Sequence, residues 1–176
     1  MSKVQSAGGL LVLVGILAAC SPAYSGAESL RTLPRALVVI SANESTFRRG
    51  EDVIVHVMIT NIGTQTIGVL KWFTPLAGVE RSLFTVQLDG VSLPYMGKLV
   101  KRAAPTLEDY VLVAGGESLK GDVDLSASYD LSVSGKYVVI YDISSPQLFG
   151  EEDTGKQQQP HDGSHLISNT LQIMIK

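Results

Sequence analysis

The segment after Asp52 carries an apolar side chain at every second position, and this alternation constrains the fold more than any other feature of the chain. Its apolar members are Val53, Val55, Val57 and Ile59. Successive side chains of an extended strand point to opposite faces, so a period of two predicts a strand with one buried face. His56 falls on the opposite face, where we expect greater exposure, and no other histidine or cysteine stands at metal-ligand spacing from it.

Similar runs recur along the chain, with turn residues between them. The clearest turn is Asp89-Gly90, a pair that tolerates the positive φ angles of a type I′ hairpin. The other strands are expected in 36–42, in 67–72, on both sides of Asp89-Gly90 within 83–95, on both sides of Gly115-Gly116 within 109–126, within 129–143 and within 168–176. In the strand at 67–72, Trp72 is expected to anchor the core or its edge.

These strands predict an all-β, immunoglobulin-like antiparallel β-sandwich of about seven to nine strands. No stretch has a sustained helical period, although a turn or two of helix fits around 105–109 and 127–131. Tyr137, two residues after Gly135 at the entrance of a strand, resembles the tyrosine corner of such sandwiches. The fold is expected to lack a disulfide, because the sequence contains one cysteine.

The first residues predict export. A short positive region and an apolar run too short to span a membrane form a signal peptide over residues 1–19. The run ends in Leu17-Ala18-Ala19-Cys20, which resembles the lipobox of bacterial lipoproteins, so Cys20 is the expected lipid attachment site. An ordinary signal peptide cleaved after Ser25 is the alternative. Residues 20–35 then form a tether, and we expect a lipid-anchored protein of the cell envelope, at the periplasmic face of the outer membrane or the cell surface.

The domain is expected over 36–176, with a long polar loop at about 144–167. This loop holds His161 and His165, which have the spacing of zinc-binding histidines in a helix. Pro160 and Gly163 indicate a turn instead, so the pair is a weak candidate for metal binding, and we expect no cofactor. The net charge of −3, without a block of like charge, argues against nucleic acid as a partner.

Two phrases resemble a known family. They are Lys71-Trp72-x-Thr74-Pro75-Leu76-x-Gly78 and Leu99-Val100-Lys101-Arg102-x-x-Pro105-x-x-x-Asp109-Tyr110. Both are similar to the N-terminal pro-region of bacterial deuterolysin-type zinc endopeptidases, the aspzincins, which include peptidyl-Lys metalloendopeptidases. The resemblance spans about 36–176 and implies a module that assists the folding of a catalytic domain or blocks its cleft. The sequence ends with the last predicted strand, so we expect a pro-domain made without its catalytic domain.

The resemblance implies a secreted zinc metalloendopeptidase as the partner and inhibition in trans as the function. Within residues 95–105, a basic side chain would enter the acidic pocket of a lysine-specific protease as a pseudo-substrate. The expected contacts are Lys98, Lys101, Arg102, Lys71, Trp72, Thr74 and Pro75. The basic residues also fit a solvated strand edge, and Trp72 and Pro75 also fit a core position and a turn.

Two other functions stay open. One is a non-catalytic binding or structural envelope lipoprotein with no protease partner. The other is metal capture by the loop that carries the histidine pair. We expect no enzyme, because the chain contains no nucleophile elbow, phosphate-binding loop or paired-carboxylate motif.

Overall fold

The computed structural model describes residues 35–144, 148–150 and 165–176, all within one compact unit, Thr32–Lys176. Eight strands span four residues or more: β1 (Ala36–Ala42), β3 (Ile54–Asn61), β4 (Ile67–Leu70), β5 (Phe84–Leu88), β7 (Tyr110–Val113), β8 (Ser118–Asp124), β9 (Gly135–Ile143) and β12 (Leu171–Ile175). Four strands span two residues: β2 (Thr46–Phe47), β6 (Val91–Ser92), β10 (Phe149–Gly150) and β11 (Leu166–Ile167). Three short 3-10 helices complete the described elements: η1 (Lys71–Phe73), η2 (Pro75–Ala77) and η3 (Leu107–Asp109).

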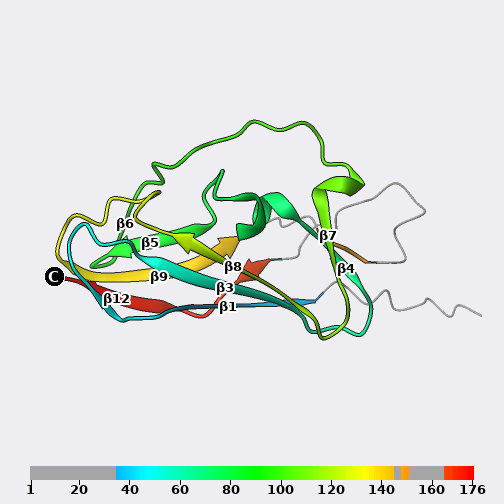
Figure 1. Ribbon diagram of the computed structural model, residues 1–176, viewed down its shortest axis with the longest axis horizontal. Helices are drawn as coiled ribbons and strands as arrows, with labels where there is room; N and C mark the ends of the chain where they lie inside the picture. Colours follow the sequence, from blue (N-terminus) through cyan, green and yellow to red (C-terminus); the bar gives the residue numbers. More distant parts are fainter. Residues whose placement is uncertain (1–34, 145–147, 151–164) are drawn as a thin grey trace, which may run out of the picture. The chain divides into compact units, whose positions relative to one another are not determined.

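The strands form an immunoglobulin-like sandwich (Figure 1). One sheet has the order β1-β3-β8, and the other has the order β2-β12-β9-β5-β6. The first order corresponds to strands A-B-E of immunoglobulin domains, and β12-β9-β5-β6 corresponds to G-F-C-C′, with the two-residue β2 added at the edge. A smaller sheet, β10-β4-β7, is added to this arrangement. Within the described ranges, no helix has the length and hydrophobicity needed to cross a bilayer.

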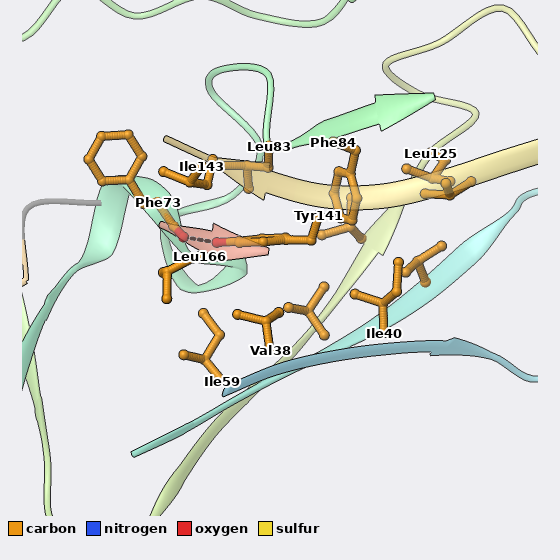
Figure 2. Close-up of a cluster of buried hydrophobic side chains, with 14 of the residues drawn as sticks. Val38, Ile40, Ile59, Phe73, Leu83, Phe84, Leu125, Tyr141, Ile143 and Leu166 are labelled. Atoms are coloured by element: carbon orange, nitrogen blue, oxygen red, sulfur yellow. Dashed lines mark hydrogen bonds between the residues drawn. The ribbon is translucent and has the colours of Figure 1, made fainter. Parts of the chain in front are cut away.

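The buried side chains come from the facing surfaces of the two main sheets, as the alternation predicted. The inner positions of β3, from Val55 to Ile59, are at most 2% exposed, whereas His56 is half-buried on the outer face. Opposite them, β9 contributes Tyr137, Val139 and Tyr141, each fully buried. Figure 2 shows Tyr141 lying between the sheets, near Val38 and Ile40 of β1.

Two local predictions are confirmed by backbone and side-chain geometry. Asp89 has φ of 49° and Gly90 has φ of 85°, the positive pair of a type I′ turn, and β5 pairs with β6 across it. The Tyr137 hydroxyl donates a hydrogen bond to the Val133 carbonyl oxygen at 2.7 Å, which is the tyrosine corner.

The structure differs from the predicted third strand. β4 ends at Leu70, and η1 and η2 replace its expected continuation, so Trp72 lies outside any strand. The contacts that hold these turns are local: the Thr74 backbone N–H and hydroxyl both donate to the Lys71 carbonyl oxygen across η1, and Pro75 begins η2.

Other differences concern pairing and the predicted loop. β12 pairs with β2 in parallel, so the sandwich is not entirely antiparallel. Within the loop expected at about 144–167, Phe149–Gly150 pairs with β4 and Leu166–Ile167 pairs with β9. Leu148 and Phe149 are buried, because this short segment closes the added sheet over the core.

Candidate functional site

The two family-like phrases fold against one another on the side of the sandwich that carries the connection from β6 to β7. The first phrase forms η1 and η2. The second lies in the arm, which we define as residues 95–105, and in η3, which follows the arm. Figure 1 shows this connection as a long green path from β6 to η3. The site is therefore built from two loops that a scaffold of sheets holds in place.

The η1–η2 segment is fixed from below by buried contacts. The Tyr141 hydroxyl, on β9, donates a hydrogen bond to the Phe73 carbonyl oxygen (Figure 2). Thr74 is fully buried, and its hydroxyl donates to the Lys71 carbonyl oxygen at 2.8 Å. Pro75 packs on Gly121 of β8, where an added Cβ would lie 2.6 Å from the proline Cγ. The neighbouring Lys71 and Trp72 are half-buried, and Trp72 packs against the hydrophobic core.

The arm is extended and exposed, but it is held at several points. The Tyr95 hydroxyl lies 3.1 Å from the Val79 carbonyl oxygen and 2.9 Å from the Lys98 carbonyl oxygen. The backbone N–H of Met96 donates to the Ser128 carbonyl oxygen at 2.9 Å. Farther along, Val100 donates from its backbone to the carbonyl oxygen of Glu80 at 3.1 Å. These bonds fix the course of the arm while leaving most of its side chains in solvent.

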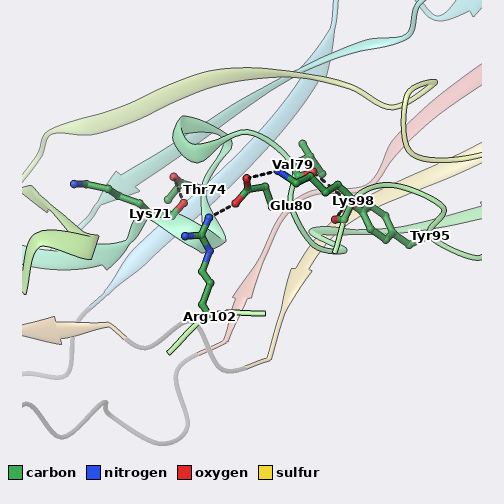
Figure 3. A network of polar contacts seen from close by, with 7 residues as sticks. All are labelled: Lys71, Thr74, Val79, Glu80, Tyr95, Lys98 and Arg102. Atoms are coloured by element: carbon green, nitrogen blue, oxygen red, sulfur yellow. Dashed lines mark hydrogen bonds and ion pairs between the residues drawn. The ribbon is translucent and has the colours of Figure 1, made fainter. Parts of the chain in front are cut away.

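The Glu80 cluster, which consists of Glu80, Lys98 and Arg102, ties the arm to the loop after η2. Figure 3 shows the carboxylate between the two basic side chains. Lys98 Nζ lies 3.2 Å from Glu80 Oε1, and the Arg102 guanidinium binds Oε2. The Lys98 hydrogen bond, with the pairing to Arg102, holds the pKa of the Glu80 carboxyl below its ordinary value. Both carboxylate oxygens are thus engaged within the chain.

The arginines beside this cluster lie over aromatic rings. Arg102 Cζ lies 5.1 Å from the ring centroid of Trp72, and Arg81 Cζ lies 4.2 Å from that of Phe73. Between the arm and the loop is a pocket of about 260 Å³, lined by Trp72, Glu80, Arg81, Leu99, Val100 and Arg102. The pocket therefore combines guanidinium groups with apolar and aromatic walls.

The end of the arm is capped where η3 begins. The backbone N–H of Thr106 donates to Asp109 Oδ2 at 2.8 Å, and this hydrogen bond is the main cause that lowers the pKa of the Asp109 carboxyl. Lys71 Nζ donates to the Glu108 carbonyl oxygen at 2.6 Å, which links η1 to η3. The two phrases therefore contact each other at both the Arg102–Trp72 and the Lys71–Glu108 positions.

The predicted contact residues fall into three groups. Lys98 and Arg102 bind Glu80, Trp72 lies beneath Arg102, and Lys71 binds the Glu108 carbonyl oxygen of η3. Thr74 and Pro75 hold η1 and η2 from within, and Thr74 has no exposed surface with which to contact a partner. Lys101 is exposed and pairs with no carboxylate in the described part of the chain.

Sequence reasoning missed the two residues that organise the site, Glu80 and Arg81. Glu80 is the only carboxylate between Asp52 and Asp89 in the sequence, and this isolation was the one feature that could have drawn attention to it. Its partners stand 18 and 22 residues further along the chain, at a spacing that predicts no contact.

The histidine candidates do not form a metal centre in the described residues. His161 lies outside them, and His165 Nε2 lies 2.7 Å from Asp142 Oδ1, on β9. His56 Nδ1 pairs with Asp122 Oδ1 at 2.7 Å across β3 and β8. Over the described ranges, no three His, Cys, Asp or Glu side chains gather as a metal site would require. Cys20 also lies outside the described residues.

No protein-family model matches the sequence. The chain is 37% identical over 109 residues to a protein of Aeromonas hydrophila named Extracellular protease. The alignment covers 62% of this chain and 31% of that protease, so the chain spans about a third of its relative's length. This similarity connects the sandwich with a region of an extracellular protease.

Solved structures resemble the fold loosely. The CARDB domain of a Pyrococcus furiosus protein is 12% identical, with a TM-score of 0.35, over 81% of this chain and 89% of that one. A β-glucosidase from Listeria innocua is 11% identical, with a TM-score of 0.37, over 81% of this chain and 16% of that one. The assignment to an immunoglobulin-like sandwich rests on the strand pairing described above.

Proposed function

We propose that the protein is a non-catalytic module that binds an extracellular zinc endopeptidase of the aspzincin type and blocks its cleft with the arm. The observation that carries this proposal is the arm itself, an extended exposed segment anchored to a rigid sandwich. The similarity to part of an extracellular protease supports the choice of partner, because it relates this domain to a region found within such an enzyme.

The arm has the physical properties that an inhibitory segment requires. Leu99 is 75% exposed and Met96 is 62% exposed, so apolar side chains are available to a partner. The Glu80 cluster and the backbone bond of Val100 fix the segment before binding. A preorganised loop loses less conformational entropy on association than a free one, and this increases affinity.

Lys101 is the side chain best placed to enter the protease. Lys98 and Arg102 are already paired with Glu80, so moving either one into a partner would break an ion pair. Lys101 lies between them in the chain and is exposed without a carboxylate partner in the described residues. Its insertion therefore requires no rearrangement of the Glu80 cluster.

The test is an inhibition assay. The chain from Thr32 onward contains the whole described core. It is mixed with the mature extracellular protease of Aeromonas hydrophila, and the rate at which the protease cleaves a lysine-containing peptide is measured. We expect dose-dependent inhibition, weakened roughly tenfold by Lys101→Ala, as for the loss of one well-placed contact. Lys136→Ala, which removes an exposed lysine from β9, is the matched control and should inhibit like the parent chain.

Full protease activity at a large excess of the domain would refute the proposal. The chain would then be a non-catalytic envelope domain with another ligand. Equal inhibition by the parent chain and Lys101→Ala would support inhibition in trans but show that Lys101 is not the side chain that enters the protease.

The location of the protein is part of the same proposal. A lipid at Cys20 would hold the domain at the envelope, where it meets a protease during secretion. Labelling with a fatty acid should mark the parent chain and not Cys20→Ser, and the variant should leave the membrane fraction. Membrane retention of an unlabelled Cys20→Ser protein would contradict this.

A further inference from the structure

The pocket beneath the arm has more positive than negative charge. Arg81 and Arg102 line the pocket, and Lys98 lies at its edge, where it pairs with Glu80. One carboxylate, that of Glu80, faces them, and its two oxygens are taken by Lys98 and Arg102. Arg81 pairs with no acid anywhere in the described ranges. The pocket and its edge therefore carry two positive charges in excess, in a chain whose net charge is −3.

Both arginines that line the pocket lie over aromatic rings. Arg81 lies over Phe73, which is buried, and Arg102 lies over Trp72. A guanidinium stacked on a ring keeps its N–H edge available, and this edge matches the two oxygens of a carboxylate. Stacking also reduces the freedom that the side chain would lose on binding. Arg81 is exposed, and its guanidinium has no carboxylate partner among the described residues.

The remaining walls of the pocket are apolar. Leu99 and Val100 line it beside Trp72, so the stem of a bound side chain would contact carbon atoms. The volume of about 260 Å³ is suited to one side chain rather than to a polymer. Nucleic acid would require a wider basic surface than this single cluster.

We propose that the pocket between the arm and η1, with Arg81 beside Trp72 and Leu99, binds a glutamate or aspartate side chain of the protein partner. The carboxylate pairs with the Arg81 guanidinium, and the stem packs on Leu99 and Val100. This inference deepens the proposed function and rests on it for the identity of the partner. It adds a second contact, in which this chain receives a side chain instead of inserting one.

The sole tryptophan of the chain, Trp72, lines the pocket and reports on its occupation by fluorescence. The full chain is titrated with N-acetyl-Leu-Glu-Leu-amide and with the same peptide carrying glutamine. We expect a saturable change in emission with the glutamate peptide and at least tenfold weaker binding of the glutamine peptide, equivalent to about 1.4 kcal/mol. Binding should weaken as salt is raised, because the contact is ionic and near the surface.

Two variants and their matched controls locate the site. Arg81→Gln should weaken binding of the glutamate peptide about tenfold, while Arg48→Gln, at an exposed arginine after β2, should not. Leu99→Glu places a competing carboxylate at the mouth and should also weaken binding, while Leu112→Glu, at a 64% exposed leucine of β7, should not. Thermal unfolding of each variant checks that the domain is folded.

The outcomes separate the two proposals. Equal binding of the glutamate and glutamine peptides, or no saturable response from the folded parent chain, would overturn the carboxylate site. Peptide binding without any protease inhibition would support the site and remove the proposed function. Inhibition of the protease without peptide binding would support the proposed function and remove the carboxylate site. Peptide binding together with inhibition that Arg81→Gln weakens would support both.

Discussion

Replacing Tyr141 with phenylalanine tests how η1 is held against the core. Tyr141 is fully buried, and its hydroxyl donates to the Phe73 carbonyl oxygen. Among the described residues no other donor reaches this oxygen. Burial raises the pKa of the Tyr141 hydroxyl, so it stays a protonated donor over the whole working range of pH. The substitution keeps the aromatic ring, which packs edge-on against Phe84 at 5.5 Å, and removes only the hydrogen bond.

The expected cost follows from the burial of the acceptor. A buried carbonyl oxygen that loses its donor costs about 1–3 kcal/mol in the free energy of unfolding. For a domain of this size, a loss of about 2 kcal/mol lowers the melting temperature by roughly 4–8 °C. Tyr137→Phe is the matched control, since it removes a 2.7 Å hydrogen bond to Val133, a residue that is 53% exposed. Water can replace the lost donor at the Val133 carbonyl oxygen, so we expect the free energy of unfolding to fall by only about 0.5–1.5 kcal/mol.

Urea unfolding, followed by circular dichroism and by Trp72 emission, measures both variants. Tyr141→Phe should shift the midpoint more than Tyr137→Phe without changing the slope of the transition. It should also alter the native emission of Trp72, because the freed carbonyl belongs to the next residue in η1. An equal or larger loss in Tyr137→Phe would refute the reasoning that acceptor burial sets the cost.

Three further predictions concern the scaffold and the Glu80 cluster. Gly68→Ala should destabilise the domain by about 1–3 kcal/mol in chemical unfolding, because an added Cβ would overlap the Phe149 ring. Asn61→Ala should cost about 2–4 kcal/mol by the same assay, since this buried side chain makes three hydrogen bonds with backbone groups between 2.7 and 2.9 Å. The lowered pKa of Glu80 means that its contribution to stability is complete above the unfolded-state pKa and is lost as pH falls through the folded-state pKa. The acid transition in Trp72 emission should therefore have its midpoint below the ordinary pKa of a glutamate side chain, and Glu80→Gln should abolish it.

The parts of the fold that were predicted correctly depend on short stretches of sequence. The alternation in β3 and the Asp89-Gly90 turn determine local geometry from neighbouring residues, so they can be recognised in a single chain. The end of β4 was missed because Ile67 to Trp72 alternates like a strand, whereas the chain turns into η1 at Lys71. A strand pattern does not indicate where a helical turn will interrupt it.

The candidate site depends on contacts between distant parts of the chain, which sequence patterns do not reveal. The Tyr141–Phe73 hydrogen bond joins residues 68 positions apart, and it fixes the backbone on which Trp72 stands. Glu80 meets Lys98 and Arg102 only because the arm returns over the loop after η2. The basic residues were predicted as contacts from the two sequence phrases and the arm, but the sequence does not indicate that Glu80 pairs with Lys98 and Arg102.

The contact between the two family-like phrases separates residues that maintain the site from residues that are available to a partner. Thr74 and Pro75 are turned inward and hold η1 and η2, so their substitution should act first on stability. Leu99 and Lys101 are turned outward on an arm whose course is fixed by other groups, so their substitution should act on binding while leaving the fold intact. Arg81 belongs with the second pair, since its guanidinium supports no ion pair within the described chain. Within the described residues, Lys101 and Arg81 form no ion pair and Leu99 is exposed, and the proposed recognition of an acidic partner relies on these three side chains.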